Sequence, residues 1–375
     1  MTKEVAGMKE GRFGFLETVC LMSLILFTKD FYSSIRVVVE TNGTAAWYMT
    51  LISCAVSLTF FLLLYLLMKR FPGKDLVQVF QLVLGKILGK VVALLFFAYF
   101  MFYAATDLRE FLEMIKAYAL PYTLPSLIIG AFIIAVLILA SKGLEVIARV
   151  GYISFFPVMF VIILILLLAS KYYDVRYLLP IGGYGFDVTL KTGFLRSSAY
   201  NEVIFLAFII NSIHGLKIFK KAGIISLVIT GLTFSGTLVC YLMAFQYTQG
   251  SENLSAMYQL ARIIYFNRFF QRIEAIFLFI WVISSIITVA MAFYISITVY
   301  CKAMNIKKHK PLLLPGAFIL FMITILPDNL SEIIEISLVI TRQYSIFFVW
   351  LVPVLVLIIS LIFRKKGRGT GNAKT

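Results

Sequence analysis

Long uninterrupted apolar runs are the feature that most constrains how this chain folds. One of them, "VMFVIILILLLAS" at 158–170, contains no charged residue. A helix needs about 20 mainly apolar residues to cross the hydrocarbon layer of a membrane, whereas the strands of an outer-membrane barrel alternate in polarity over about 10 residues. The composition, 61% hydrophobic and only 14% charged, also lies far from that of a soluble domain. We therefore predict an all-α integral membrane protein.

The runs predict ten transmembrane helices, within a single transmembrane domain that spans 1–375. Their expected ranges are 13–39, 45–68, 88–107, 124–141, 146–169, 190–213, 222–246, 273–301, 311–327 and 344–363.

The distribution of basic residues predicts the orientation in the bilayer. A formal charge of +16 is explained by the positive-inside rule rather than by nucleic-acid binding. Most basic residues fall in connectors that share one side, together with a basic tail at 364–375, and the connector at 327–335 on the other side is acidic. We expect a multi-pass membrane protein with its N- and C-termini in the cytoplasm.

Ten helices divide into two sets of five, at approximately 13–169 and 190–363. An odd number in each set makes the second half enter from the opposite side, so the repeat is inverted. Transporters built in this way interrupt the first helix of each half and bind their substrate there. The two halves have no clear residue-by-residue similarity, so the 5+5 inverted repeat with discontinuous helices 1 and 6 is inferred from position.

The first span contains a polar interruption, Thr28, Lys29 and Asp30, within "FTKDFYSS". A charge inside a span is costly unless it is paired or hydrated. A helix break frees backbone groups and allows a water-lined cavity that hydrates the charges. We predict a ligand site at this break. The alternative is that the span ends at Phe27 and that Lys29 and Asp30 begin an outer loop.

The sixth span contains a second polar cluster, Tyr200, Asn201 and Glu202. Glu202 is the expected central acidic group, which accepts a ligand ammonium, pairs with Lys29 or takes up a coupling proton. The alternative is a structural ion pair between helices, because an unpaired carboxylate in the membrane would become protonated.

Two further regions carry polar residues. In the eighth span Trp281 and Ser284 are candidate ligand-binding residues, and the alternative is ordinary helix packing through small side chains. After the third span, "LREFLEMIKAYALP" at 108–121 predicts a separate amphipathic helix in the membrane interface.

Nothing in the chain predicts an enzyme, a cofactor or a metal site. The four cysteines, Cys20, Cys54, Cys240 and Cys301, lie in apolar spans without C-x-x-C spacing. The sequence contains no H-E-x-x-H, G-x-S-x-G or P-loop motif.

Four stretches together resemble a known family: "RFPGKDLVQ" (70–78), "NEVIF" (201–205), "RIEAIFLFIWVISS" (272–285) and "LPDN" (326–329). The chain resembles the B subunits of bacterial spore germinant receptors, which belong to the amino acid–polyamine–organocation transporter superfamily. The resemblance covers nearly the whole chain and implies the ten-helix inverted-repeat fold with helices 1 and 6 unwound midway. It also implies a nutrient, commonly an amino acid, in that gap, together with separate A and C subunits in the inner membrane of the spore.

The break residues depart from the family pattern. Asn201 replaces the usual glycine before Glu202, and Thr28-Lys29-Asp30 replaces a small, glycine-containing break. One hypothesis is that the Lys29 ammonium occupies the place of a cation or a substrate amine. The leading function is a nutrient-sensing receptor subunit that triggers germination. The alternative is a proton-coupled secondary transporter of amino acids or related organic cations.

Overall fold

The described part of the chain is helical. The computed structural model describes residues 11–265, 272–327, 332 and 337–367. The helical segments are α1 (Phe15–Phe27), η1 (Thr28–Phe31), α2 (Ser34–Asn42), η2 (Gly43–Ala45), α3 (Ala46–Arg70), α4 (Leu76–Leu84), α5 (Lys86–Tyr118), α6 (Pro125–Lys142), α7 (Leu144–Leu168), η3 (Ala169–Tyr172), η4 (Val175–Leu178), α8 (Phe186–Leu195), η5 (Arg196–Ile204), α9 (Phe205–Phe208), α10 (Leu216–Ala244), α11 (Tyr247–Gly250), α12 (Ala256–Ile263), α13 (Ile273–Met304), α14 (Lys310–Ile325), η6 (Ser337–Tyr344), α16 (Ser345–Val349) and α17 (Leu351–Ile362).

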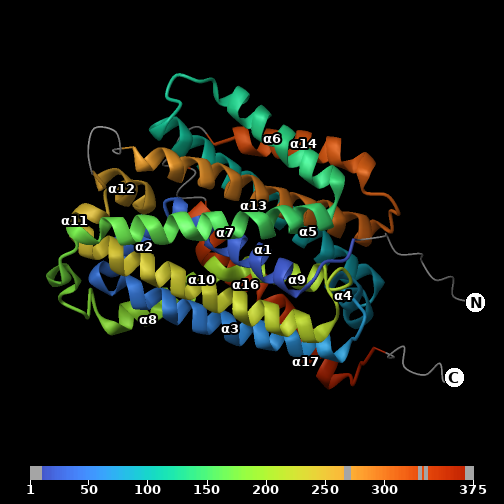
Figure 1. Cartoon of the computed structure of the whole chain (residues 1–375). Coiled ribbons are helices and arrows are strands. Elements are labelled where there is room, and N and C mark those ends of the chain that lie inside the picture. Colours follow the sequence, from blue (N-terminus) through green and yellow to red (C-terminus); the bar gives the residue numbers. More distant parts are fainter. Residues whose placement is uncertain (1–10, 266–271, 328–331, 333–336, 368–375) are drawn as a thin grey trace, which may run out of the picture.

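Length and composition identify membrane-crossing helices directly. Within the described residues, seven helices are long and apolar enough to cross a bilayer, and α14 is a shorter apolar helix. The long helices run side by side along one direction of the molecule (Figure 1). Large apolar side chains such as Ile134, Ile153 and Phe160 point outward from α6 and α7, as a surface in contact with lipid requires. The protein is therefore a multi-pass membrane protein.

Short connections keep several successive helices adjacent. Gly143 alone separates α6 from α7, at a φ of 92° that favours glycine because other residues meet steric strain there.

At the start of α4 the Asp75 side chain accepts a hydrogen bond from the Gln78 amide, and the Gln78 side chain accepts one from the Asp75 amide. This capping box satisfies amides that have no partner inside the helix.

Helix α1 lies at the centre of the molecule. Every residue from Thr18 to Phe27 is buried, so the helix has no lipid-facing side. A helix that is apolar all round is expected in the middle of a bundle, and α1 packs there against α7, α10 and α13 (Figure 1).

The first and sixth spans are both interrupted. Helix 1 consists of α1, the 3₁₀ segment η1, a turn at Tyr32–Ser33 and α2. Helix 6 consists of α8, the nine-residue 3₁₀ segment η5 and the short α9. The alternative in which helix 1 ends at Phe27 before an outer loop is wrong, because the chain becomes helical again at Ser34.

Side chains satisfy the backbone groups that the interruptions release. In helix 1, the Phe31 carbonyl accepts from the Ser255 hydroxyl at 2.8 Å, and the Ser33 amide donates to Glu110 at 3.0 Å. In helix 6, the Ser197 carbonyl accepts from the Ser57 hydroxyl at 2.9 Å. A polar backbone group left unsatisfied in the membrane interior costs several kcal/mol, so these partners permit the breaks.

The interfacial helix predicted at 108–121 is wrong. Helix α5 continues without interruption to Tyr118, and Glu110 within it is fully buried. The sequence suggested an interfacial segment because the partner of Glu110, Arg342, is 232 residues away and local patterns do not reveal it.

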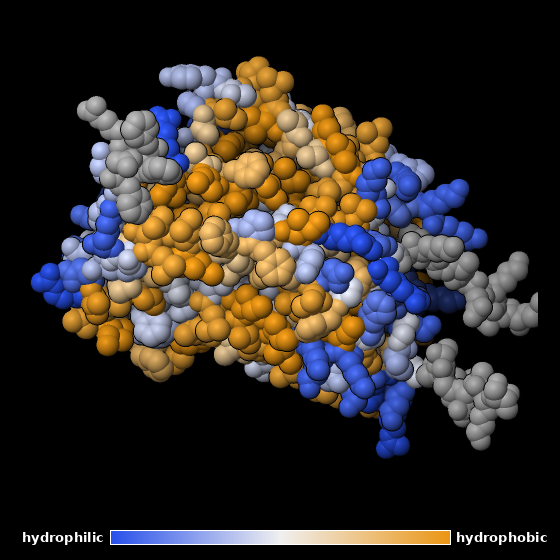
Figure 2. Space-filling view, viewed as in Figure 1, coloured by the Kyte–Doolittle hydropathy of each residue, from blue (hydrophilic) through white to orange (hydrophobic). Residues whose placement is uncertain are grey.

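The two ends of the molecule differ in polarity. Helix α4 and the end of α17 lie at one end, and α2, α8, α11 and α12 lie at the other (Figure 1). Strongly hydrophilic residues gather at the α4 end, and a broad apolar band occupies the middle (Figure 2). The predicted basic tail from 368 onward and most of the acidic connector at 327–335 lie outside the described residues.

Candidate functional site

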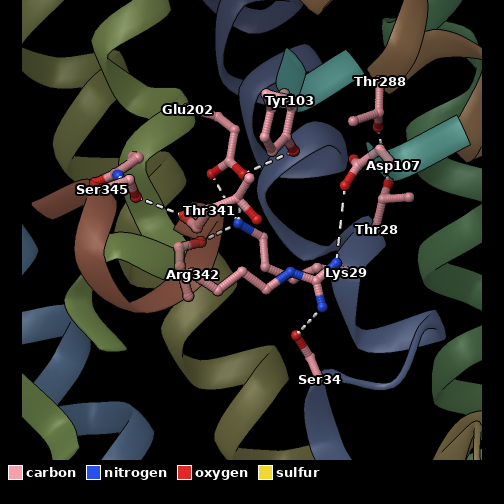
Figure 3. Close-up of polar contacts among 12 residues, drawn as sticks. Thr28, Lys29, Ser34, Tyr103, Asp107, Glu202, Thr288, Thr341, Arg342 and Ser345 are labelled. Carbon is pink, nitrogen blue, oxygen red and sulfur yellow. Dashed lines mark hydrogen bonds and ion pairs between the residues drawn. The ribbon is translucent and has the colours of Figure 1, made fainter. Parts of the chain in front are cut away.

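An ion pair joins the two interrupted helices. The Lys29 ammonium on η1 lies 2.7 Å from both carboxylate oxygens of Glu202 on η5, and each side chain is only 5% exposed. Lys29 also donates to the Ala199 carbonyl, and the Tyr103 hydroxyl donates to Glu202 at 2.8 Å (Figure 3). The pairing of Glu202 with Lys29, one of the roles predicted from sequence, is present in the structure.

A second buried ionic cluster lies beside the first, and its arginine, Arg342, is not among the residues predicted from sequence. Arg342 on η6 donates to Glu110 at 2.8 Å and to the Ser34 hydroxyl at 2.7 Å (Figure 3). Asp107 lies 3.8 Å from the same guanidinium. Arg342 therefore links α2, the second half of helix 1, to α5. The predicted span at 344–363 begins two residues too late to include it, and its position in a π-helical segment, a frequent mark of function, is visible only in the structure.

The other helix 1 candidates occupy different positions. The Thr28 hydroxyl donates to the Leu24 carbonyl at 2.6 Å and accepts from Thr288 at 3.2 Å, which ties the break to α13. Asp30 is 2% exposed, and its Oδ1 atom has no hydrogen-bond partner among the described residues.

The other helix 6 candidates flank Glu202. The Tyr200 hydroxyl donates to the Thr50 carbonyl on α3 at 3.3 Å. The Asn201 amide donates to the Ser345 hydroxyl at 2.7 Å, which connects helix 6 to α16. The Asn201 side chain therefore ties the break in helix 6 to another helix.

Trp281 and Ser284 lie deep in α13 and are not in the ionic clusters. Trp281 is fully buried and packs against Tyr32, Phe111 and Phe277. The Ser284 hydroxyl donates to the Ile280 carbonyl of its own helix at 2.8 Å. Their contacts in the structure are those of helix packing.

Two small cavities flank the Lys29–Glu202 pair. Lys29, Arg196 and Tyr200 line the first, together with Leu26, Ser34, Val38, Met49, Thr50, Ser53, Ala199 and Phe234. Tyr99, Phe100, Tyr103, Asn201, Glu202 and Phe205 line the second. Each cavity has a volume of about 10 Å³, which is room for a single water molecule. The site is therefore closed in this structure, and a larger ligand requires the helices to move apart.

A larger cavity lies between the α3–α4 turn and the chain that follows α9. It measures about 290 Å³, and its lining includes Arg12, Gly73, Asn211 and His214. No residue of the ionic clusters borders it.

Two solved structures share this architecture. The crystal structure of MhsT in complex with L-phenylalanine matches with a TM-score of 0.64 at 12% identity, over 96% of this chain and 91% of that chain. MHP1, a nucleobase-cation-symport-1 family transporter in a closed conformation with bromovinylhydantoin bound, matches with a TM-score of 0.61 at 12% identity, over 96% and 93%. These likenesses confirm the predicted transporter fold with discontinuous helices.

Sequence relatives are germination proteins. Spore germination protein KB of Bacillus subtilis (strain 168) is 26% identical over 333 residues, which are 87% of this chain and 89% of that protein. Spore germination protein GerQB of Bacillus cereus is 24% identical over 248 residues, 66% and 68% of the two chains. The spore permease family, described as spore germination protein, matches residues 14–333. The chain is a non-enzymatic membrane protein, and it belongs to the spore germination protein family.

Proposed function

We propose that this protein is the nutrient-sensing B subunit of a spore germinant receptor. A small nutrient, in the first place an amino acid, binds between the interrupted helices 1 and 6 and triggers germination. The observation that carries this proposal is the Lys29–Glu202 ion pair, which joins one break to the other at 2.7 Å. Because the pair holds both helices, a ligand that rearranges it changes how they sit relative to each other.

In this proposal, sensing requires the closed cavities beside Lys29 and Glu202 to open. A ligand larger than water must favour an arrangement with more space around Lys29 and Tyr200. It shifts the population toward that arrangement only by its difference in affinity between the open and closed states. The receptor's A and C subunits, in the inner membrane of the spore, are the proposed partners that read this change.

The test replaces Lys29 with methionine in the full receptor. Lys29→Met removes the ammonium and leaves Glu202 buried without its partner, a change that costs several kcal/mol in other buried pairs. We expect the nutrient concentration for half-maximal germination to change by about tenfold or more, or the response to disappear. The measurement is the loss of spore optical density against single nutrients, with L-alanine first.

Lys191→Met is the matched control, because Lys191 is exposed on α8 of the same interrupted helix. Immunoblots of spore membranes establish equal protein levels. A dose response for Lys29→Met identical to wild type, at equal protein level, contradicts the proposed site.

A secondary transporter is the second candidate, and two observations favour it. MHP1, which has the same fold, is a nucleobase-cation-symport-1 family transporter, and a cavity of about 290 Å³ lies at the end of the helix 6 region. Proteoliposomes that contain this protein alone distinguish the two functions. Accumulation of radiolabelled amino acid, driven by a proton gradient, supports transport, and its absence with retained binding supports sensing.

A further inference from the structure

Arg196 is a buried cation that has no hydrogen-bond or ion-pair partner among the described residues. It begins the 3₁₀ segment of helix 6 and is 8% exposed. Lys29 pairs with Glu202, Arg342 with Glu110, and Arg109 with Glu113. By contrast, the described residues offer Arg196 neither a hydrogen bond nor an ion pair. An arginine keeps its charge in proteins, so it cannot escape the cost of burial by losing a proton.

The guanidinium borders the first of the two small cavities. Three hydroxyl groups on the same lining are already donating: Thr50 to the Trp47 carbonyl, Ser53 to the Gly193 carbonyl and Tyr200 to the Thr50 carbonyl. The fourth, Ser34, accepts a hydrogen bond from Arg342. Among the described residues on this lining, Arg196 is therefore the charged donor that remains available to a ligand, and the Ser34 hydroxyl is the neutral one.

The charges around the cavity favour an anion. The charges of Arg342 and Glu40 both act on Arg196, but Arg342 is itself paired with Glu110 and Glu40 is exposed on α2. Lys29, also on the lining, is paired with Glu202, so Arg196 is the cation on the lining that no carboxylate of the described residues pairs with. The lining also includes apolar side chains, among them Val38, Met49 and Phe234.

Resting on the proposed nutrient-sensing function, we propose that Arg196 binds the carboxylate of the nutrient. A guanidinium presents parallel N–H donors that match the two oxygens of a carboxylate. The apolar lining then receives the rest of a small molecule. Lys29 already neutralises Glu202, so recognition does not need an amine on the ligand, and the ligand class is small carboxylic acids, amino acids among them.

The first experiment compares carboxylates with their amides on the full-length protein in nanodiscs. The probes are acetate, L-lactate, L-alanine and L-phenylalanine, beside acetamide, L-lactamide, L-alaninamide and L-phenylalaninamide. A compound that binds the folded state raises the Tm of thermal unfolding. We expect at least one carboxylate to raise the Tm, with no effect of its amide at the same concentration. The proposal falls if no carboxylate raises the Tm, or if the amides act equally.

The second experiment changes the guanidinium, with the active carboxylate as probe. We expect Arg196→Gln to raise its Kd roughly tenfold to a hundredfold, the worth of a hydrogen bond to a charged group. Arg196→Lys keeps the charge without the paired donors, so its Kd should lie between those of the wild-type protein and Arg196→Gln. Arg176→Gln is the control, because Arg176 is 87% exposed and pairs with Asp174 in an outer connector. Unchanged affinity in Arg196→Lys and Arg196→Gln overturns the proposal.

Two outcomes separate this inference from the proposed function. Equal binding of an acid and its amide, with a changed germination response in Lys29→Met, retains nutrient sensing and removes the carboxylate contact at Arg196. A Tm increase by inorganic phosphate that depends on Arg196, without one by any carboxylate, replaces the ligand class. If Arg196→Gln does not fold, the acid–amide comparison on the wild-type protein and Arg196→Lys still decide.

Discussion

Lys29 and Glu202 show how two charges can be accommodated in a membrane interior. Attraction between buried charges offsets their lost hydration only when further hydrogen bonds complete the geometry. Here Tyr103 donates to the carboxylate, and the Ala199 carbonyl accepts from the ammonium. The pair is therefore tied to α5 as well as to both breaks. Replacing only Lys29 or only Glu202 leaves the other side chain buried without its partner, whereas replacing both removes both members of the pair.

The buried Lys29–Glu202 pair should give a non-additive mutant cycle. Glu202→Gln should lower the free energy of unfolding by about 3–5 kcal/mol, because it leaves Lys29 buried without its counterion. The double variant Lys29→Met with Glu202→Met should be less destabilised than Glu202→Gln alone. Denaturant unfolding in detergent micelles measures each value.

The control for this cycle is Glu145→Gln, which removes an exposed pair with Arg149. Its expected effect is at most about 1 kcal/mol. A double variant whose loss equals the sum of its two single losses would exclude the buried pair as an interacting unit.

At the scale of elements, small residues set how closely the helices approach. Gly223 on α10 faces Phe61 on α3, and a Cβ atom at Gly223 would overlap the phenyl ring. The same ring stacks on Phe219 one turn earlier, with 5.2 Å between centroids. Packing of small residues is a main source of helix association in lipid, where no hydrophobic effect acts between helices.

Gly223→Ala should therefore destabilise the protein by about 1–3 kcal/mol through overpacking. Gly236→Ala on the same helix is the control, because nothing lies within 4 Å of its added Cβ atom. Adding Phe61→Leu to Gly223→Ala should recover part of the loss. The Tm in nanodiscs measures all three variants, and equal Tm values for the two glycine variants would contradict this packing argument.

At the scale of the whole molecule, the hydrophilic end that contains α4 fits the predicted cytoplasmic side (Figure 2). Lys74, in the α3–α4 turn, is exposed at that end. Tyr122 is 99% exposed in the connector between α5 and α6, which follows the opposite end of α5. These two positions report on the orientation of the protein in the bilayer.

The orientation predicts opposite labelling of two introduced cysteines. In right-side-out vesicles, a membrane-impermeant maleimide should label Tyr122→Cys directly and Lys74→Cys only after the vesicles are opened. The parent chain is the control, because its four cysteines are buried or half-buried. The reverse pattern would place the termini outside and remove the predicted cytoplasmic location.

The sequence by itself determined the features that depend on local composition. Apolar runs of membrane-spanning length identified the helical membrane fold, and the polar residues at Thr28–Asp30 and Tyr200–Glu202 marked where two of those helices break. The reason is physical: a charge within a membrane span is costly, so it occurs where it is paired or hydrated and commonly marks a functional site. The two repeat boundaries, 13–169 and 190–363, stay a prediction.

Only the tertiary structure decided which charges meet. Lys29 and Glu202 are 173 residues apart, and Glu110 and Arg342 are 232 residues apart. No local pattern encodes such partners, so the charged end of α5 resembled an interfacial helix and Arg342 was missed. Nor could sequence reveal that Arg196 is buried beside a cavity with no counterion among the described residues, because a missing partner depends on all the neighbours that packing brings together.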